Sequence, residues 1–441
     1  MFTLISSVGS SLAAFAVTLS IWYLIVVAAA AAAAALARGG RRERAVDAYE
    51  ALAVSRFTIP VSIVVPVVDD SAPLPASIAA LLGLNYPELE VIVVADPMAE
   101  ASMQALKTEW SLEPKELFYR RMLATGPVRR IYSSRRDARL TVVEKEAAGR
   151  ADALNCGSNL ARFRYVVTVA PGVVCDADAL LRLMSPALRD PAAVLAVTSY
   201  VERTPGGSEA AALPDGEWTR AWDDYQRLAS IRSWMTSRLA WHQLRCGLPP
   251  VDAVAAWRRD AVLEHGGFSL TAADAELDLL VRLQISHPDR AGRVVRTSEV
   301  FGHAGTVTVG RAAGIAGRRQ RAMLEAIGRL RKTASANPSR RAMVPVLAVE
   351  LLTPAAQAIA VAMVLGGAVA GVVGWSSPLL LLLMLSFGYG LISASALLLR
   401  GGTPGAPSRT DLKRLLIRAP LEFAVYRPAL LWSRARGSFQ R

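Results

Sequence analysis

The chain has 441 residues, of which 53% are hydrophobic, and its formal net charge at pH 7 is +13. A soluble basic protein rarely has so high an apolar content. The arginine clusters also lack the interleaved aromatic residues that a nucleic-acid stacking surface needs. The composition therefore argues against nucleic acid as a partner and favours membrane lipids or a phosphorylated substrate.

An uncharged apolar segment from Ser11 to Leu36 lies near the start of the chain. At about 1.5 Å per residue, this segment can cross a hydrocarbon core of roughly 30 Å. A secretory signal is the alternative, but no lysine or arginine precedes the segment, which is also longer than an h-region of about 7–15 residues. The sequence therefore predicts an N-terminal transmembrane helix over residues 8–37.

From Thr58 onward, continuous apolar runs alternate with helical patterns. Strands are expected at residues 59–66, 89–95, 139–143 and 165–169, and helices at 76–84, 180–188, 218–245 and 278–283, with a further helix ending near 110. This alternation predicts an α/β domain over residues 56–335 with a mainly parallel sheet. Ligands of such sheets bind outside the carboxyl ends of the strands.

The three cysteines, Cys156, Cys175 and Cys246, form no CxxC pair, and we expect them to be reduced and structural. Two further apolar segments between residues 343 and 399 predict two transmembrane helices. Basic residues flank the predicted spans on one side, which places the middle section in the cytoplasm of a multi-pass inner-membrane protein. Residues 409–441 predict a basic amphipathic tail lying on the membrane surface.

Five segments, in this order, resemble those of the membrane-bound glycosyltransferases of family 2, the processive-synthase-like group. They are VSIVVPVVDDSAPL, LNYPELEVIVVADP, VEKEAAGRADALNCG, WRRDAVLEHGGF and LEFAVYRPALL. The resemblance covers about residues 56–436. It implies a GT-A domain (the nucleotide-diphospho-sugar transferase fold) between transmembrane helices, and transfer of a sugar from a nucleotide sugar such as a UDP-sugar.

The resemblance also implies a Mg²⁺ or Mn²⁺ ion held by an Asp-x-Asp motif. The matching positions in this chain are Ala170, Pro171 and Gly172, and none of them has a side chain that can bind a metal. We therefore predict that the metal site has been lost. The alternative ligands are Asp176 and Asp178, but both directly precede an apolar-periodic helix, where aspartate is typical of a helix cap.

The general-base position of the family corresponds to Glu276, which is one methylene longer than the family's aspartate. A base must lie within about 2.6–3.2 Å of the proton that it takes, so the longer side chain can misplace the carboxylate. The alternative is an exposed carboxylate at the start of a helix.

The QxxRW motif of the family corresponds to Gln320 through Leu324, where Met323 and Leu324 replace its arginine and tryptophan. Arg318 and Arg321 share one helical face and could clamp a diphosphate without a metal. A solvated basic helix is an equally good interpretation.

The donor-binding positions of the family are better preserved. The resemblance assigns Asp96 to contact with uridine and places the other donor-binding residues in the first loop and in the KAD segment, at Val67, Asp69, Asp70, Arg150 and Asp152.

Three functions stay open at this point. The first is a glycosyltransferase of cell-surface or exopolysaccharide synthesis, with impaired activity. The second is a catalytically inactive homologue that scaffolds an active polysaccharide synthase, and the third is a transferase in which arginine replaces the metal. Since losing the ion removes several kcal/mol of transition-state stabilisation, the mechanism favours the scaffold. Three spans are few for a channel, so we also expect a synthase partner or a homo-oligomer.

Overall fold

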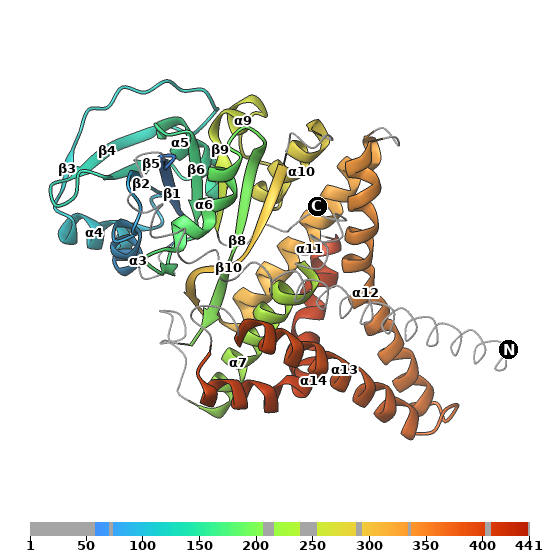
Figure 1. Cartoon of the computed structure of the whole chain (residues 1–441). Helices are drawn as coiled ribbons and strands as arrows, with labels where there is room; N and C mark the ends of the chain where they lie inside the picture. Colours follow the sequence, from blue (N-terminus) through green and yellow to red (C-terminus); the bar gives the residue numbers. More distant parts are fainter. Residues whose placement is uncertain are drawn as a thin grey trace.

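The computed structural model describes residues 58–69, 74–205, 216–238, 254–287, 293–333, 337–401 and 407–439. Figure 1 shows an α/β domain on one side and a group of long helices, formed mostly by the C-terminal third of the chain, on the other. The predicted N-terminal span over residues 8–37 lies outside the described residues.

Ten strands form one sheet in the order β3-β4-β5-β2-β1-β6-β9-β8-β10-β7. Their bounds are β1 Val61–Val67, β2 Leu89–Ala95, β3 Leu112–Pro114, β4 Val128–Ser134, β5 Leu140–Lys145, β6 Tyr165–Val169, β7 Val174–Cys175, β8 Val194–Thr204, β9 Val254–Arg258 and β10 Arg293–Gly305. Strands β5-β2-β1-β6 run parallel to one another, as do β8 and β10.

The prediction of a mainly parallel sheet is wrong, because the sheet is mixed. Strand β9 lies between β6 and β8 and runs antiparallel to both, and β4 and β7 pair antiparallel with their neighbours. The apolar runs of β1 and β2 are fully buried because helices cover both faces of the sheet. That burial pattern carries no information about the direction of the outer strands.

The two faces of β1 meet different helices. Ile63 and Val65 pack in one cluster with α3 (Leu74–Leu82), α4 (Glu100–Glu109) and α6 (Ala179–Arg189). Val64 points the other way and packs in a cluster with α5 (Gly149–Leu160), α9 (Arg259–Glu264), α10 (Ala275–Ser286) and α11 (Val309–Lys332). Alternating side chains of one strand thus build two separate cores.

The remaining helices are α7 (Glu217–Arg232), continued by a π-helical segment at Ser233–Arg238, and the C-terminal helices α12 (Pro338–Val369), α13 (Ser376–Gly401) and α14 (Arg409–Phe439). Two stretches, Glu350–Val369 and Ser376–Gly401, are long and apolar enough to cross a membrane. Within the described residues, these two helices are the features that suggest a membrane, so the third span and the inner-membrane location stay predictions.

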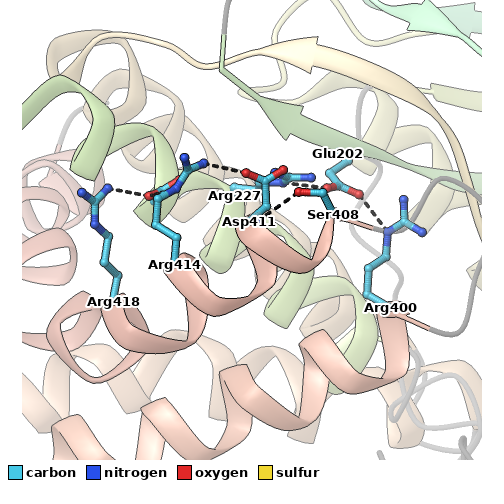
Figure 2. Close-up of polar contacts among 8 residues, drawn as sticks. Glu202, Arg227, Arg400, Ser408, Asp411, Arg414 and Arg418 are labelled. Carbon is cyan, nitrogen blue, oxygen red and sulfur yellow. Dashed lines mark hydrogen bonds and ion pairs between the residues drawn. The ribbon is translucent and has the colours of Figure 1, made fainter. Parts of the chain in front are cut away.

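Helix α14 corresponds to the predicted amphipathic tail, and it packs against α7, α11 and α13. Leu415, Ala419 and Phe423 are buried on this face. Figure 2 shows that charged residues also join these helices to the sheet. Glu202 of β8 is fully buried and accepts hydrogen bonds of 2.8 Å from both Arg227 of α7 and Arg400 of α13.

Candidate functional site

The candidate site lies at the carboxyl ends of the parallel strands β1, β2, β5 and β6. Val67 is buried and pairs with Ala95 in the register of β1 and β2, and the Asp96 amide donates to the Val67 carbonyl at 2.9 Å. Asp69 follows β1 on the same edge. The structure therefore brings together the three donor-binding positions that the sequence predicts at this edge, whereas Asp70 lies outside the described residues.

A buried lysine connects the two best-preserved acidic residues. Lys145, at the end of β5, is fully buried, and its Nζ contacts Asp152 Oδ2 and lies 3.8 Å from Asp96 Oδ1. Asp152 Oδ1 also accepts from the Gly126 amide at 2.8 Å. Lys145 is the one lysine of the segment VEKEAAGRADALNCG, and it was not among the predicted site residues.

One oxygen of Asp96 has no hydrogen-bond partner in the described part of the chain, although the Lys145 ammonium lies 3.8 Å from it. Its Oδ2 accepts from the Gly149 amide at 3.3 Å, whereas the buried Oδ1 has no hydrogen-bond partner among the described residues. Burial raises the pKa of this carboxyl, and the neighbouring Lys145 charge partly offsets the rise. A buried acceptor without a partner costs about 1–3 kcal/mol, so this oxygen is suited to accept a hydrogen bond from a ligand.

Glu276 is buried near the start of α10, so the alternative of an exposed carboxylate is wrong. Its Oε2 pairs with Arg150 Nη2 at 2.9 Å, and its Oε1 accepts from the Thr168 hydroxyl of β6 at 2.6 Å. The Trp257 indole in turn donates to Thr168 Oγ1 at 3.1 Å. Both carboxylate oxygens of Glu276, the predicted base, are therefore engaged. Arg150 pairs with Glu276 and not with Asp96 or Asp152, which lie beside Lys145.

The loop after β6 contains Ala170, Pro171 and Gly172, and Gly172 has a positive φ of 80°. Since these residues carry no oxygen, nitrogen or sulfur in their side chains, a metal ion held by side chains does not fit this loop. Among the residues that the structure describes, no three His, Cys, Asp or Glu side chains are placed together for a metal.

Asp176 and Asp178 make other contacts. Asp176 pairs with Arg182 at 2.8 Å, and Asp178 Oδ1 accepts from Asn85 Nδ2 at 3.0 Å. Asp178 occupies the N-cap position of α6, but its side chain makes no capping hydrogen bond. The predicted helix-cap position of Asp178 is therefore confirmed, although its carboxylate turns to Asn85 of the segment after α3 instead of capping a backbone amide.

Helix α11 reaches the same edge of the sheet through a residue that the sequence analysis missed. Arg311 Nη2 lies 3.8 Å from Asp69 Oδ2, which ties the first turn of α11 to the end of β1. Gln320 is buried further along α11, and Arg318 is exposed. The sequence does not single out Arg311, because α11 contains several arginines and nothing in the local pattern shows which of them faces the site.

The fold is that of a GT-A glycosyltransferase. The mannosyltransferase PcManGT from Pyrobaculum calidifontis, solved with GDP-Man and Mn2+, superposes with a TM-score of 0.52 over 96% of this chain and 99% of that chain, at 16% identity. No protein-family model matches the sequence, and no curated protein matches it either.

Two other solved structures are also similar. TarS 1–349 of S. aureus with UDP-GlcNAc has a TM-score of 0.42 and 12% identity, covering 87% of this chain and 93% of that chain. Glucosyl-3-phosphoglycerate synthase from Mycobacterium tuberculosis, with Mn2+, UDP-Glc and PGA, has a TM-score of 0.38 and 17% identity over 65% and 85% of the two chains.

Proposed function

We propose that the chain is a membrane glycosyltransferase of family 2 that binds a nucleotide sugar at the Asp69–Asp96 edge, with lowered activity. Its sugar would go to a cell-surface polysaccharide or exopolysaccharide. The observation that carries the proposal is the buried Asp96 Oδ1, which has no hydrogen-bond partner among the described residues, beside the fully buried Lys145. An N–H group of a nucleobase, or a ribose hydroxyl, is the kind of donor that such an oxygen needs.

Sugar transfer would move the anomeric carbon from the donor diphosphate to an acceptor hydroxyl, which gives up its proton. Glu276 corresponds to the general base of the family, which would accept this proton. Arg150 and Thr168, however, each hold one of its two oxygens. It could accept a proton readily only after one of these contacts opens, and this supports slow chemistry. Arg311 is positioned to meet a negatively charged group next to Asp69.

Titration of the full chain in detergent with UDP- and GDP-sugars tests donor binding. We expect Asp96→Asn to weaken the binding of the preferred nucleotide at least about tenfold, because a charge-assisted hydrogen bond is worth roughly 1.5–3 kcal/mol. Glu113→Gln is the control, since Glu113 forms an exposed ion pair on β3. Equal affinities of wild type and Asp96→Asn would contradict the proposed site.

A second candidate function is a catalytically inactive homologue that scaffolds an active synthase. It is favoured by the lack of a ligating side chain at Ala170 and Gly172, together with the engaged oxygens of Glu276. Turnover measured with and without Mn²⁺ separates the candidates. Slow metal-independent turnover supports the transferase, and nucleotide binding without turnover supports the scaffold. Mn²⁺-dependent turnover that Asp176→Asn or Asp178→Asn abolishes would refute the predicted loss of the metal site.

A further inference from the structure

Two side chains of α7 hold the segment that joins β10 to α11. Trp222 Nε1 donates to the Val307 carbonyl at 3.0 Å, and Gln226 Nε2 donates to the same oxygen at 2.8 Å. The Val307 amide in turn donates to Gln226 Oε1 at 3.1 Å. Trp222 and Gln226 are four residues apart, so they share one face of α7, and both are buried. Both backbone polar groups of Val307 are thus fixed from this helix.

These contacts fix the start of α11. Thr308 follows Val307 and is the N-cap of α11, where its side chain accepts a hydrogen bond from the Arg311 amide at 3.4 Å. Trp222 also packs in one apolar cluster with two buried alanines of α11. Four residues after Val307, the Arg311 guanidinium reaches the carboxyl edge of the sheet, where its Nη2 lies 3.8 Å from Asp69 Oδ2. The contacts of α7 therefore lie directly before the residue of α11 that faces the candidate site.

The helix α7 is itself anchored on α14, which follows both candidate spans in the chain. The centre of the Trp222 ring lies 5.0 Å from that of Tyr426, and the buried Asp224 pairs with two arginines of α14. Contacts of α7 thus lead from α14 on one side to the start of α11 on the other. The C-terminal helices therefore contribute to the position of Arg311.

The ion pair between Arg311 and Asp69 does less to fix this part of α11. The two side chains are 39% and 46% exposed, and an ion pair between exposed groups contributes little to stability because water and salt screen it. The hydrogen bonds at Val307, in contrast, come from buried side chains whose polar groups are costly to leave without partners. The contacts of Val307 therefore have the larger effect on where the Arg311 backbone lies.

We propose that Gln226 and Trp222 are positioning residues that hold Arg311 for the diphosphate of a nucleotide sugar. This inference rests on the proposed function, which puts the nucleotide at the edge of the sheet beside Asp69. The paired N–H donors of a guanidinium match phosphate oxygens only in a defined geometry. A displacement of the helix start by about 1 Å is enough to weaken such a contact. Both positioning residues act through Val307 and not on the ligand itself.

Titration of the full chain in detergent with a nucleoside and with its diphosphate tests this role. The pairs are uridine with UDP and guanosine with GDP, and ligand-observed NMR measures both affinities. We expect Arg311→Gln to weaken diphosphate binding at least about tenfold. Gln226→Met should weaken it at least about fivefold, the lower end of the usual coupling between two sites. Nucleoside affinity should stay unchanged in both variants, which also shows that they are folded.

Ser230→Ala is the matched control on the same helix. Ser230 lies one turn beyond Gln226, and its hydroxyl donates to the Tyr200 hydroxyl at 3.3 Å and not to Val307. This variant removes one hydrogen bond of α7 but keeps both contacts of Val307. We expect it to bind the nucleoside and the diphosphate as wild type does.

The double variant Gln226→Met/Arg311→Gln should bind the diphosphate no more weakly than Arg311→Gln alone, because Gln226 acts through Arg311. Additive losses, or equal losses for nucleoside and diphosphate, would indicate a general structural role and overturn the proposal. Hydrogen exchange without nucleotide gives a second readout. At residues 306–312 it should become faster in Gln226→Met and keep the wild-type rate in Ser230→Ala, and unchanged exchange in Gln226→Met also overturns the proposal.

The two proposals fail in different ways. If wild type bound neither the nucleoside nor the diphosphate, the nucleotide site would be refuted, and the role of Gln226 with it. If wild type bound both ligands and Gln226→Met kept the full affinity for the diphosphate, the positioning role alone would be refuted.

Discussion

At Asp96, burial and the Lys145 ammonium act on the pKa in opposite directions, and burial prevails, so the pKa lies above its ordinary value of 3.8. The folded protein therefore holds this proton more tightly than the unfolded chain. The contribution of Asp96 to the free energy of unfolding must then fall as the pH rises between the unfolded and the folded pKa. Asp96→Asn cannot titrate. We expect its stability relative to wild type to increase through this window and to level off above it, in denaturant unfolding from about pH 4 to about pH 7. If the difference in stability between Asp96→Asn and wild type did not change with pH, the raised pKa of Asp96 would be contradicted.

Two of the cysteines should be inert for the same physical reason. Burial raises the pKa of both Cys156 and Cys175 to about 12, and the thiolate is the reactive form. We expect neither residue to be alkylated by iodoacetamide at about pH 8 in the native protein, and both to be alkylated in denaturant, as read by peptide mass spectrometry. Rapid native labelling of Cys175, which is partly exposed, would show that its thiol is more acidic than its surroundings indicate. Cys246 lies outside the described residues.

At the scale of single elements, the packing of α5 on β1 depends on a glycine. A Cβ atom at Gly157 would lie 2.3 Å from Val64 Cγ1 and 2.9 Å from Cγ2. Gly157→Ala should therefore force the helix away from the strand and lower the free energy of unfolding by about 1–3 kcal/mol, despite the better helix propensity of alanine. Thermal unfolding in detergent measures the change. Gly328→Ala on α11 is the matched control, because nothing lies within 4 Å of its Cβ position, and it should be neutral or stabilising.

The same elements show what the sequence could reveal. The strands at 89–95 and 165–169 were predicted to the residue, because their apolar runs are buried on both faces. Strands β8, β9 and β10 were missed; β9 follows a long helical segment and enters between β6 and β8 from the opposite direction. Of the site, Asp69 and Asp96 were predictable from their place after strands. The Arg150–Glu276 pair joins residues 126 positions apart, a contact that no local pattern contains.

At the scale of the whole molecule, buried charges as well as a buried apolar cluster join the long helices to the sheet. Glu202 of β8 meets Arg227 of α7 and Arg400 of α13, and both Glu202 and Arg400 are fully buried (Figure 2). Glu202 thus pairs with two guanidinium groups from separate helices, of which Arg227 also lies 3.5 Å from Asp411 Oδ2. Neither arginine can readily reach water if the carboxylate is removed. The orientation of α13, a candidate membrane span, therefore depends on one residue of the α/β domain.

Glu202→Gln should accordingly lower the free energy of unfolding by about 3–5 kcal/mol, the cost of breaking a buried ion pair by removing one of its charges. Hydrogen exchange should also become faster in β8 and in the last turns of α13, while β1 and β2 stay protected. Arg135→Gln is the control, because its ion pair with Glu113 is exposed and worth less than about 1 kcal/mol. Uniformly faster exchange in every strand would mean that Glu202 supports the domain core, and the proposed link between the sheet and α13 would then have to be abandoned.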